Sequence, residues 1–213
     1  GFGTIFLKKG YSLQRTYALS KLESAMMPAI QVGLLVLVVT APAFIFFSQK
    51  GPGAMHAPWL ISLAAGLVVG GLSQVSRLCT VGGFRDLFLF KKSILIFGYL
   101  AVLVGVFVVN ISFGNFHLGF ENQPIAHTDG LWNFLGMALA GFCSVLLGGC
   151  PLRQLIMTGE GNSDAAVTVL GLAAGAAFAH NFGLAASGAG PTLNGQIAVG
   201  VGFVVALIIA ILN

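Results

Sequence analysis

Six apolar runs divide this chain, and their length limits the folds it can adopt. A membrane-spanning helix needs about 20 mostly apolar residues, because each residue adds about 1.5 Å along the axis. The chain is 57% hydrophobic and only 8% charged, whereas soluble domains carry about 25% charged residues. It is therefore predicted to be an all-α integral membrane protein of about six transmembrane helices. The predicted spans are 29–47, 59–75, 93–111, 131–147, 165–179 and 197–212.

The basic residues indicate how these helices are oriented. The net charge is +4, but the lysines and arginines lie mostly between the apolar runs, so they are interpreted as topology signals and not as a nucleic-acid surface. When alternate loops are assigned to alternate sides, only Lys50 falls on the far side. The positive-inside rule then places both ends of this chain in the cytoplasm. The near side carries Lys8, Lys9, Arg15, Lys21, Arg77, Arg85, Lys91, Lys92 and Arg153.

A short pattern occurs twice and suggests an internal repeat. A glycine is followed, after eight intervening residues, by a cysteine, as in Gly70 to Cys79 and in Gly141 to Cys150. Both copies then pass through a predicted helix break into an arginine, a polar residue and a leucine. Transporters are commonly built from such repeats, with interrupted helices around the substrate site. The first break is predicted to hold Gly82 and Gly83, and the second Gly148, Gly149 and Pro151.

The cysteines of the repeat have arginines as neighbours, which suggests a path for an anion. A helix interrupted at membrane depth leaves backbone groups that only protein or a water-filled cavity can satisfy. An arginine costs at least ~2.5 kcal/mol there, so it should be paired or should face an anion. We therefore predict an anion pathway lined by Cys79 and Cys150, together with Arg77, Arg85 and Arg153.

The chemical state of the two thiols leaves three functions open. A neutral S–H can donate a weak hydrogen bond to a passing anion, whereas a thiolate could carry out sulfur or selenium transfer through a persulfide-type intermediate. Inert buried thiols in a structural subunit are the third alternative. Cys143 is expected to be a small buried hydrophobe, and a disulfide between Cys79 and Cys150 is left open. No metal or cofactor is predicted, because the cysteine spacing is not that of a zinc or cluster site.

The segment after the second break supplies weaker candidates. Asn162 or Ser163 is expected to cap a helix that begins near Asp164, whose carboxylate suits a helix N-terminus. Glu160 could pair with an arginine of either break and reduce the charge that attracts anions. The weaker candidates for the pathway are Glu160, Asn162, His180 and Asn181.

The first residues predict that this chain belongs to a longer protein. It opens "GFGTIFLKKGY", which is typical of the last turns of a spanning helix at its cytoplasmic anchor. A signal peptide would have its charges before the apolar stretch. We predict a single transmembrane domain over 1–213: a cytoplasmic lead-in with the tail of a missing helix (1–27), a first cysteine-loop unit (28–92) and a second (93–213).

Four stretches carry a resemblance to a known family. They are "SRLCTVGGFRDLFLF", "GPGAMHAPWL", "FENQPIAHTDGLWNFLGM" and "GGCPLRQLIMTGEGNSDAAVTVLGLAAGAAFAHNFGLA". They resemble the YeeE/YedE family of bacterial inner-membrane proteins, and in particular its YedE branch, which is associated with selenium metabolism. The resemblance implies a transporter for a small sulfur- or selenium-containing anion such as thiosulfate. Cysteines in central loops of such proteins pass the anion along by transient hydrogen bonds to its sulfur.

The same resemblance implies roles for residues and partners. Cys79 and Cys150 match the cysteine-loop positions of the family's second half, and Cys143 lies outside the pattern. Family members are roughly twice as long as this chain, which resembles only their second half. The implied partners are the anion, the lipid bilayer, the missing first half or a second copy, and a cytoplasmic sulfur- or selenium-transfer protein.

Overall fold

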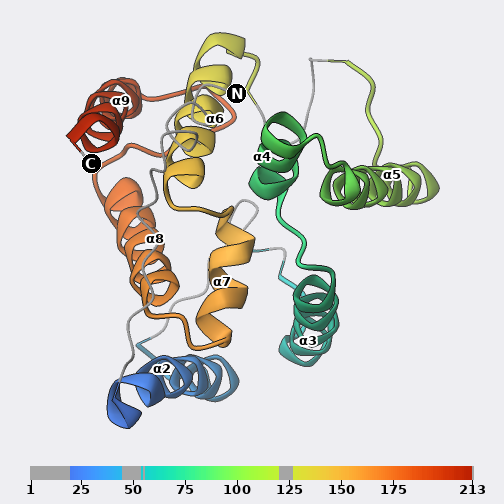
Figure 1. Ribbon diagram of the computed structural model, residues 1–213. Helices are drawn as coiled ribbons and strands as arrows, with labels where there is room; N and C mark the ends of the chain where they lie inside the picture. The colour runs from blue at the N-terminus through green and yellow to red at the C-terminus, as the bar shows by residue number, and fades with distance from the viewer. Residues whose placement is uncertain (1–19, 45–53, 55, 120–126, 213) are drawn as a thin grey trace.

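The regular structure of this chain is helical wherever it is described. The computed structural model describes residues 20–44, 54, 56–119 and 127–212, and no strand is found in those ranges. Figure 1 shows how the helices are arranged. In chain order they are α2 (Lys21–Thr40), α3 (Trp59–Ser76), α4 (Thr80–Phe90), α5 (Ile94–Ser112), α6 (Gly130–Leu146), α7 (Pro151–Gly159), α8 (Ser163–Asn181) and α9 (Leu193–Leu212).

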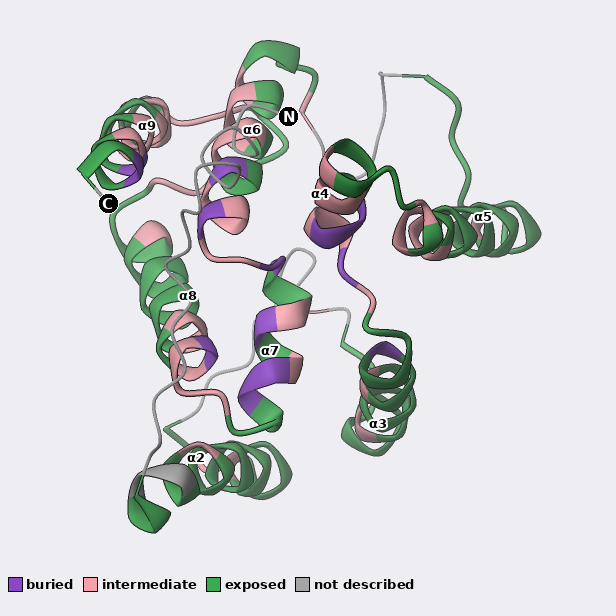
Figure 2. Cartoon of the chain, viewed as in Figure 1, coloured by how far each residue is buried: buried purple, intermediate pink, exposed green. Residues whose placement is uncertain are grey.

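Five described spans are long and apolar enough to cross a membrane. At most 28% of each apolar window is buried inside the protein, so most of its side chains face outward, which Figure 2 shows as exposed surface along the helices. Lipid is the solvent that such apolar surfaces require. The prediction of an all-α membrane protein is confirmed. The spans are Trp59–Phe90, Ile94–Ser112, Gly130–Gly159, Ser163–Asn181 and Leu193–Leu212, and a shorter apolar helix covers Ala25–Thr40.

Two helices begin earlier than their predicted spans. α2 starts at Lys21 and α9 at Leu193, because hydropathy alone does not detect a polar first turn. The start of α9 is fixed by Thr192, whose side-chain oxygen accepts a hydrogen bond from the backbone N–H of Gly195 at 2.9 Å. A side-chain acceptor in this place is the usual way to satisfy a free N–H at a helix start. α2 ends at Thr40, before the predicted end at residue 47, which lies outside the described residues.

The first helix break lies before Cys79. α3 ends at Arg77, which has the left-handed φ of 52°, and Cys79 is extended with φ −152° and ψ 114°. The prediction that Gly82 and Gly83 lie in this break is wrong, because α4 has already begun at Thr80. Both glycines are buried in its first turns. A Cβ on Gly83 would lie 3.3 Å from the backbone nitrogen of Ile96, so a missing side chain lets α4 approach α5.

The second break separates α6 from α7 and holds Gly148 and Gly149, as the sequence predicted, whereas Pro151 already belongs to α7. Gly148 has a φ of +80° and turns the chain, which glycine does without steric cost. Cys150 is extended, with φ −70° and ψ 163°, and Pro151 begins α7. Proline suits the first helical position, since its missing N–H would have no partner there.

Helix packing brings α7 against helices from both halves of the chain, α8 above all and also α2 and α3. α7 packs against α8, α4 against α5, and α6 against α9. The core between α6 and α9 consists of Phe142, Leu146, Ala206 and Ala210. Figure 2 shows further buried residues at the start of α4 and along α7. The two helix breaks therefore lie in the most enclosed part of the described chain.

Candidate functional site: two thiols where two helices begin

The two cysteines of the repeated pattern meet where α4 and α7 begin. Cys79 is the N-cap of α4, and its sulfur accepts a hydrogen bond from the backbone N–H of Gly82 at 3.2 Å. The backbone N–H of Cys150 donates to the same sulfur at 3.5 Å, across 71 positions of sequence. Each cysteine is 6% exposed. One sulfur atom thus connects the two helix breaks.

Cys150 occupies the equivalent position at the start of α7. Its sulfur makes no cap hydrogen bond of its own. Its side chain lies beside that of Cys79 and beside Thr80. Both cysteines are free thiols. The site therefore holds two neighbouring cysteine sulfurs that the protein shields from its surroundings.

Both thiols lie at the positive ends of helices. The first turn of a helix leaves backbone N–H groups without intrahelical partners, and the aligned peptide dipoles add positive partial charge there. α4 has 11 residues and α7 has 9. Where two such ends meet, they can stabilise negative charge between them. This arrangement can hold an anion against thiols without placing a full positive charge on either side of it.

Arg153 links the two breaks through its side chain. It lies in the first turn of α7, and one guanidinium nitrogen donates to the Gln74 side-chain oxygen on α3 at 3.4 Å. Another guanidinium nitrogen lies 3.4 Å from a carboxylate oxygen of Glu160, the C-cap of α7. The sequence left an arginine of either break open as the partner of Glu160, and the structure shows Arg153 in that role.

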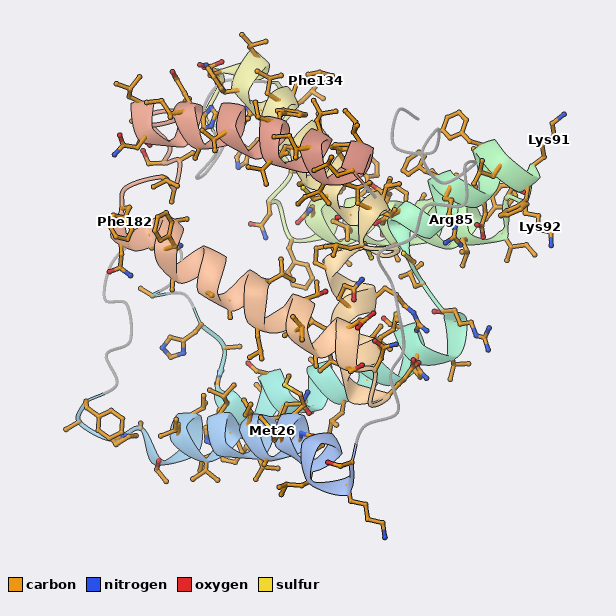
Figure 3. The ribbon with its side chains drawn as sticks, turned by 60° about the vertical axis from the view of Figure 1, so that its left-hand side comes forward. Met26, Arg85, Lys91, Lys92, Phe134 and Phe182 are labelled. Atoms are coloured by element: carbon orange, nitrogen blue, oxygen red, sulfur yellow. The ribbon has the colours of Figure 1, made fainter. Side chains whose placement is uncertain are left out.

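The other two arginines lie farther out on the protein. Arg85 forms an ion pair with the adjacent Asp86 at 2.9 Å, and its side chain is 37% exposed. In Figure 3 Arg85 lies on the same side of the molecule as Lys91 and Lys92, which follow α4. Arg77 is exposed at the end of α3. The Arg85 side chain is thus more exposed than that of Arg153, which is 19% exposed.

Both cysteine loops lie in a segment of the chain that matches a known protein family. Residues 75–212 match the family described as sulphur transport, and this range includes both cysteine loops and more than half of the chain. The chain belongs to the sulphur transport family. The predicted resemblance to the YeeE/YedE proteins is thereby confirmed.

This sulphur transport family member is also similar to a protein with a named substrate. Over 111 residues the chain is 29% identical to the thiosulfate transporter TsuA of Escherichia coli (strain K12). The match covers 50% of this chain and 30% of that relative, so the chain spans well under two thirds of its length. No solved structure matches the chain.

The weaker candidates of this family member have separate roles. Asn162 caps α8, because its side-chain oxygen accepts from the backbone N–H of Ala165 at 2.9 Å. The Asn181 side chain donates to the Ala177 carbonyl within the same helix. His180 is exposed beside it. The described contacts therefore give Asn162 and Asn181 structural partners and do not join His180 to the thiols.

One buried residue of the site was missed in the sequence. Gln154 is only 3% exposed. Its side-chain nitrogen donates to the carbonyl of Leu147, the residue that ends α6, at 3.2 Å. Gln154 therefore ties the start of α7 to the end of α6 across the break. The available signal was its place as the polar residue that follows the arginine in the repeated pattern.

Cys143 lies apart from the thiol pair. It is half-buried on α6 and packs against the core formed by α6 and α9, beside Leu139 and Leu207. Packing of this kind is what a small apolar side chain provides. Its environment agrees with the expectation that Cys143 is a structural residue.

Proposed function

We propose that this protein carries a small sulfur-containing anion, such as thiosulfate, across the bacterial inner membrane. In this proposal the anion contacts Cys79 and Cys150 on its way and is attracted by Arg77, Arg85 and Arg153. The observation that carries the proposal is the pair of shielded thiols at the meeting of two helix N-termini. The family match and the similarity to a protein named as a thiosulfate transporter support it.

The chemistry of the site suits passage better than tight binding. Conduction requires a site favourable enough to enter and weak enough to leave. Helix N-termini supply partial positive charge, and a thiol is a weak hydrogen-bond donor. An anion between the two breaks would thus be held by several weak contacts. In this proposal Gly82, Gly83, Gly148 and Gly149 also belong to the pathway, and a Cβ on Gly82 would lie 3.4 Å from the Cys79 sulfur.

The decisive experiment is uptake of radiolabelled thiosulfate by cells that express the full-length gene. We expect Cys79→Ala and Cys150→Ala each to reduce uptake by at least tenfold, since each removes one of the two S–H groups. Cys143→Ala is the matched control and should retain wild-type uptake, because its side chain packs in the α6–α9 core. Wild-type uptake by both site variants would overturn the role of the thiols. Radiolabelled selenite in a parallel assay tests a selenium species as substrate.

A sulfur-transfer reaction is the second candidate, and the adjacency of the two thiols favours it. A thiolate at Cys150 would attack the outer sulfur of thiosulfate and release sulfite, leaving a persulfide on the cysteine. The neighbouring Cys79 thiolate could then displace hydrosulfide and form a disulfide. Mass spectrometry of the protein after exposure to thiosulfate separates the two functions. Sulfur retained on Cys150, or a disulfide between Cys79 and Cys150, would support transfer, and unmodified thiols together with uptake would support transport.

The chain's orientation in the membrane and its protein partners are also part of the proposed function. We infer that both ends of this chain face the cytoplasm, because its basic residues are predicted almost entirely on one side. We also propose that a first half of the protein, or a second copy of this chain, completes the pathway, since the match covers only 30% of the relative. A cytoplasmic sulfur- or selenium-transfer protein is the partner expected to receive the anion.

A further inference from the structure

We propose that Glu160 competes with the transported anion for the Arg153 guanidinium and thereby limits how tightly the anion binds beside Cys150. This inference rests on the proposed function and adds a specificity-determining residue to it. In the absence of the anion, the carboxylate of Glu160 pairs with the guanidinium of Arg153, which the anion would otherwise contact. Entry of the anion then exchanges one negative partner of Arg153 for another.

The position of the arginine side chain is the first support. Arg153 lies three residues after Cys150, in the first turn of α7, but its guanidinium contacts Glu160, seven residues farther along the chain. Seven residues correspond to about two helical turns, or about 10 Å. The stem of the Arg153 side chain lies at the thiol end of α7, because a Cβ on Gly149 would be 3.4 Å from its Cβ and Cγ. The guanidinium at its tip is held by Glu160 and Gln74.

The weakness of the ion pair is the second support. Both contacts of Arg153, to Glu160 and to Gln74, are 3.4 Å long, whereas charge-assisted hydrogen bonds are typically about 2.7 to 2.9 Å. The side chains of Arg153 and Glu160 are 19% and 34% exposed. A partly exposed pair of this length is exchangeable. An anion with several oxygens can replace the single carboxylate oxygen that now faces the guanidinium.

The position of Glu160 is the third support. It is the C-cap of α7, where the helix dipole places negative partial charge. A carboxylate is disfavoured at that end of a helix, and the last turn of α7 contains no basic residue. The dipole of α7 therefore does not favour an acidic residue at this position, and its carboxylate pairs with Arg153. The Arg85–Asp86 pair offers a contrast, because its contact is shorter, at 2.9 Å, and joins adjacent residues.

The test is the concentration of thiosulfate that gives half-maximal uptake in proteoliposomes that contain the full-length protein. Glu160→Gln should lower this concentration roughly two- to fivefold, the factor expected for a partly exposed ion pair. Glu160→Asp, which keeps the charge, should remain close to wild type. Asp129→Asn is the matched control, because it removes the same charge from the N-cap of α6, where asparagine also caps a helix, and it should leave the value unchanged.

A second arm isolates the arginine. Arg153→Gln should raise the half-maximal concentration. Adding Glu160→Gln to it should produce no further change, because the guanidinium for which Glu160 and the anion compete is then absent. Wild-type uptake with an unchanged or raised value in Glu160→Gln would overturn this inference alone. So would a decrease of equal size in the Arg153→Gln background. Absence of thiosulfate uptake by the wild-type protein would overturn the proposed function and this inference with it.

Discussion

Gly148 determines the course of the second break. Its φ of +80° lies in the left-handed region, which costs other L-residues roughly 1–2 kcal/mol. The turn it makes brings Gly149 and Cys150 into buried positions. A residue with a Cβ at 148 would either strain this turn or move the start of α7.

Gly148→Ala should therefore destabilise the protein by roughly 1–2 kcal/mol. Thermal unfolding of the purified protein in detergent checks this, with Gly200→Ala as the control. Gly200 lies inside α9, and a Cβ there would meet no atom within 4 Å. Because alanine is the better helix former, Gly200→Ala should unfold at the same or a higher temperature. An equal loss in both variants would mean that the turn at Gly148 has no special cost.

At the residue scale, the sequence predicted the reactive groups and missed those that orient them. Cys79 and Cys150 were found through their repeated spacing, and Arg153 through its distance from Cys150. The contacts of Gln154 and Gln74 were missed: Gln154 appeared only as the polar residue of the repeated pattern, and one sequence does not show what such a side chain contacts. Their roles depend on which carbonyl or guanidinium a distant helix presents. That information arises only when α3, α6 and α7 pack together.

The elements that matter most are the two short helices. α4 and α7 are too short to cross a membrane alone, and each continues an interrupted span. Their N-termini meet because the N–H of Cys150 binds the sulfur of Cys79. The sequence predicted both interruptions, but it placed Gly82 and Gly83 in the first one. A glycine pair is equally compatible with a turn and with the close helix packing seen between α4 and α5, so composition could not separate the two.

Cross-linking tests the meeting of α4 and α7. In a Cys143→Ala background, mild oxidation with a copper–phenanthroline complex should join Cys79 to Cys150, since their side chains are neighbours. The cross-link should block thiosulfate uptake, and reduction with dithiothreitol should restore it. Digestion between the cysteines followed by non-reducing electrophoresis shows whether the fragments stay connected. Fragments that separate, although both thiols react with maleimide after denaturation, would contradict the observed proximity.

At the scale of the whole molecule, hydropathy predicted most of the fold. The lengths of the apolar runs predicted which segments span the bilayer, because backbone groups in lipid must be satisfied within a helix. They could not predict polar first turns, such as that of α9, which depend on capping by Thr192. Nor could they predict which helices pack together, since outward-facing surfaces are apolar throughout.

The orientation of the molecule is tested by reporter fusions at residue 213. If the basic residues set the topology as proposed, a green fluorescent protein fused there should fluoresce in bacterial cells. Alkaline phosphatase at the same position should be inactive, because it needs the oxidising periplasm. Moving either reporter to residue 128, which precedes α6, should reverse the pattern. An active phosphatase at residue 213 would show that the ends of this chain face the periplasm.

The shared sulfur of Cys79 has a mechanical consequence. Two helices that belong to different spans hold the same atom, one through Gly82 and the other through Cys150. If α7 rotates away from α4, the contact from the Cys150 N–H, which is the longer of the two, must break first. The Cys79 sulfur then becomes exposed in the same movement. Opening the passage and uncovering the thiol are then a single event, so the rate at which Cys79 is alkylated would measure how often the passage opens.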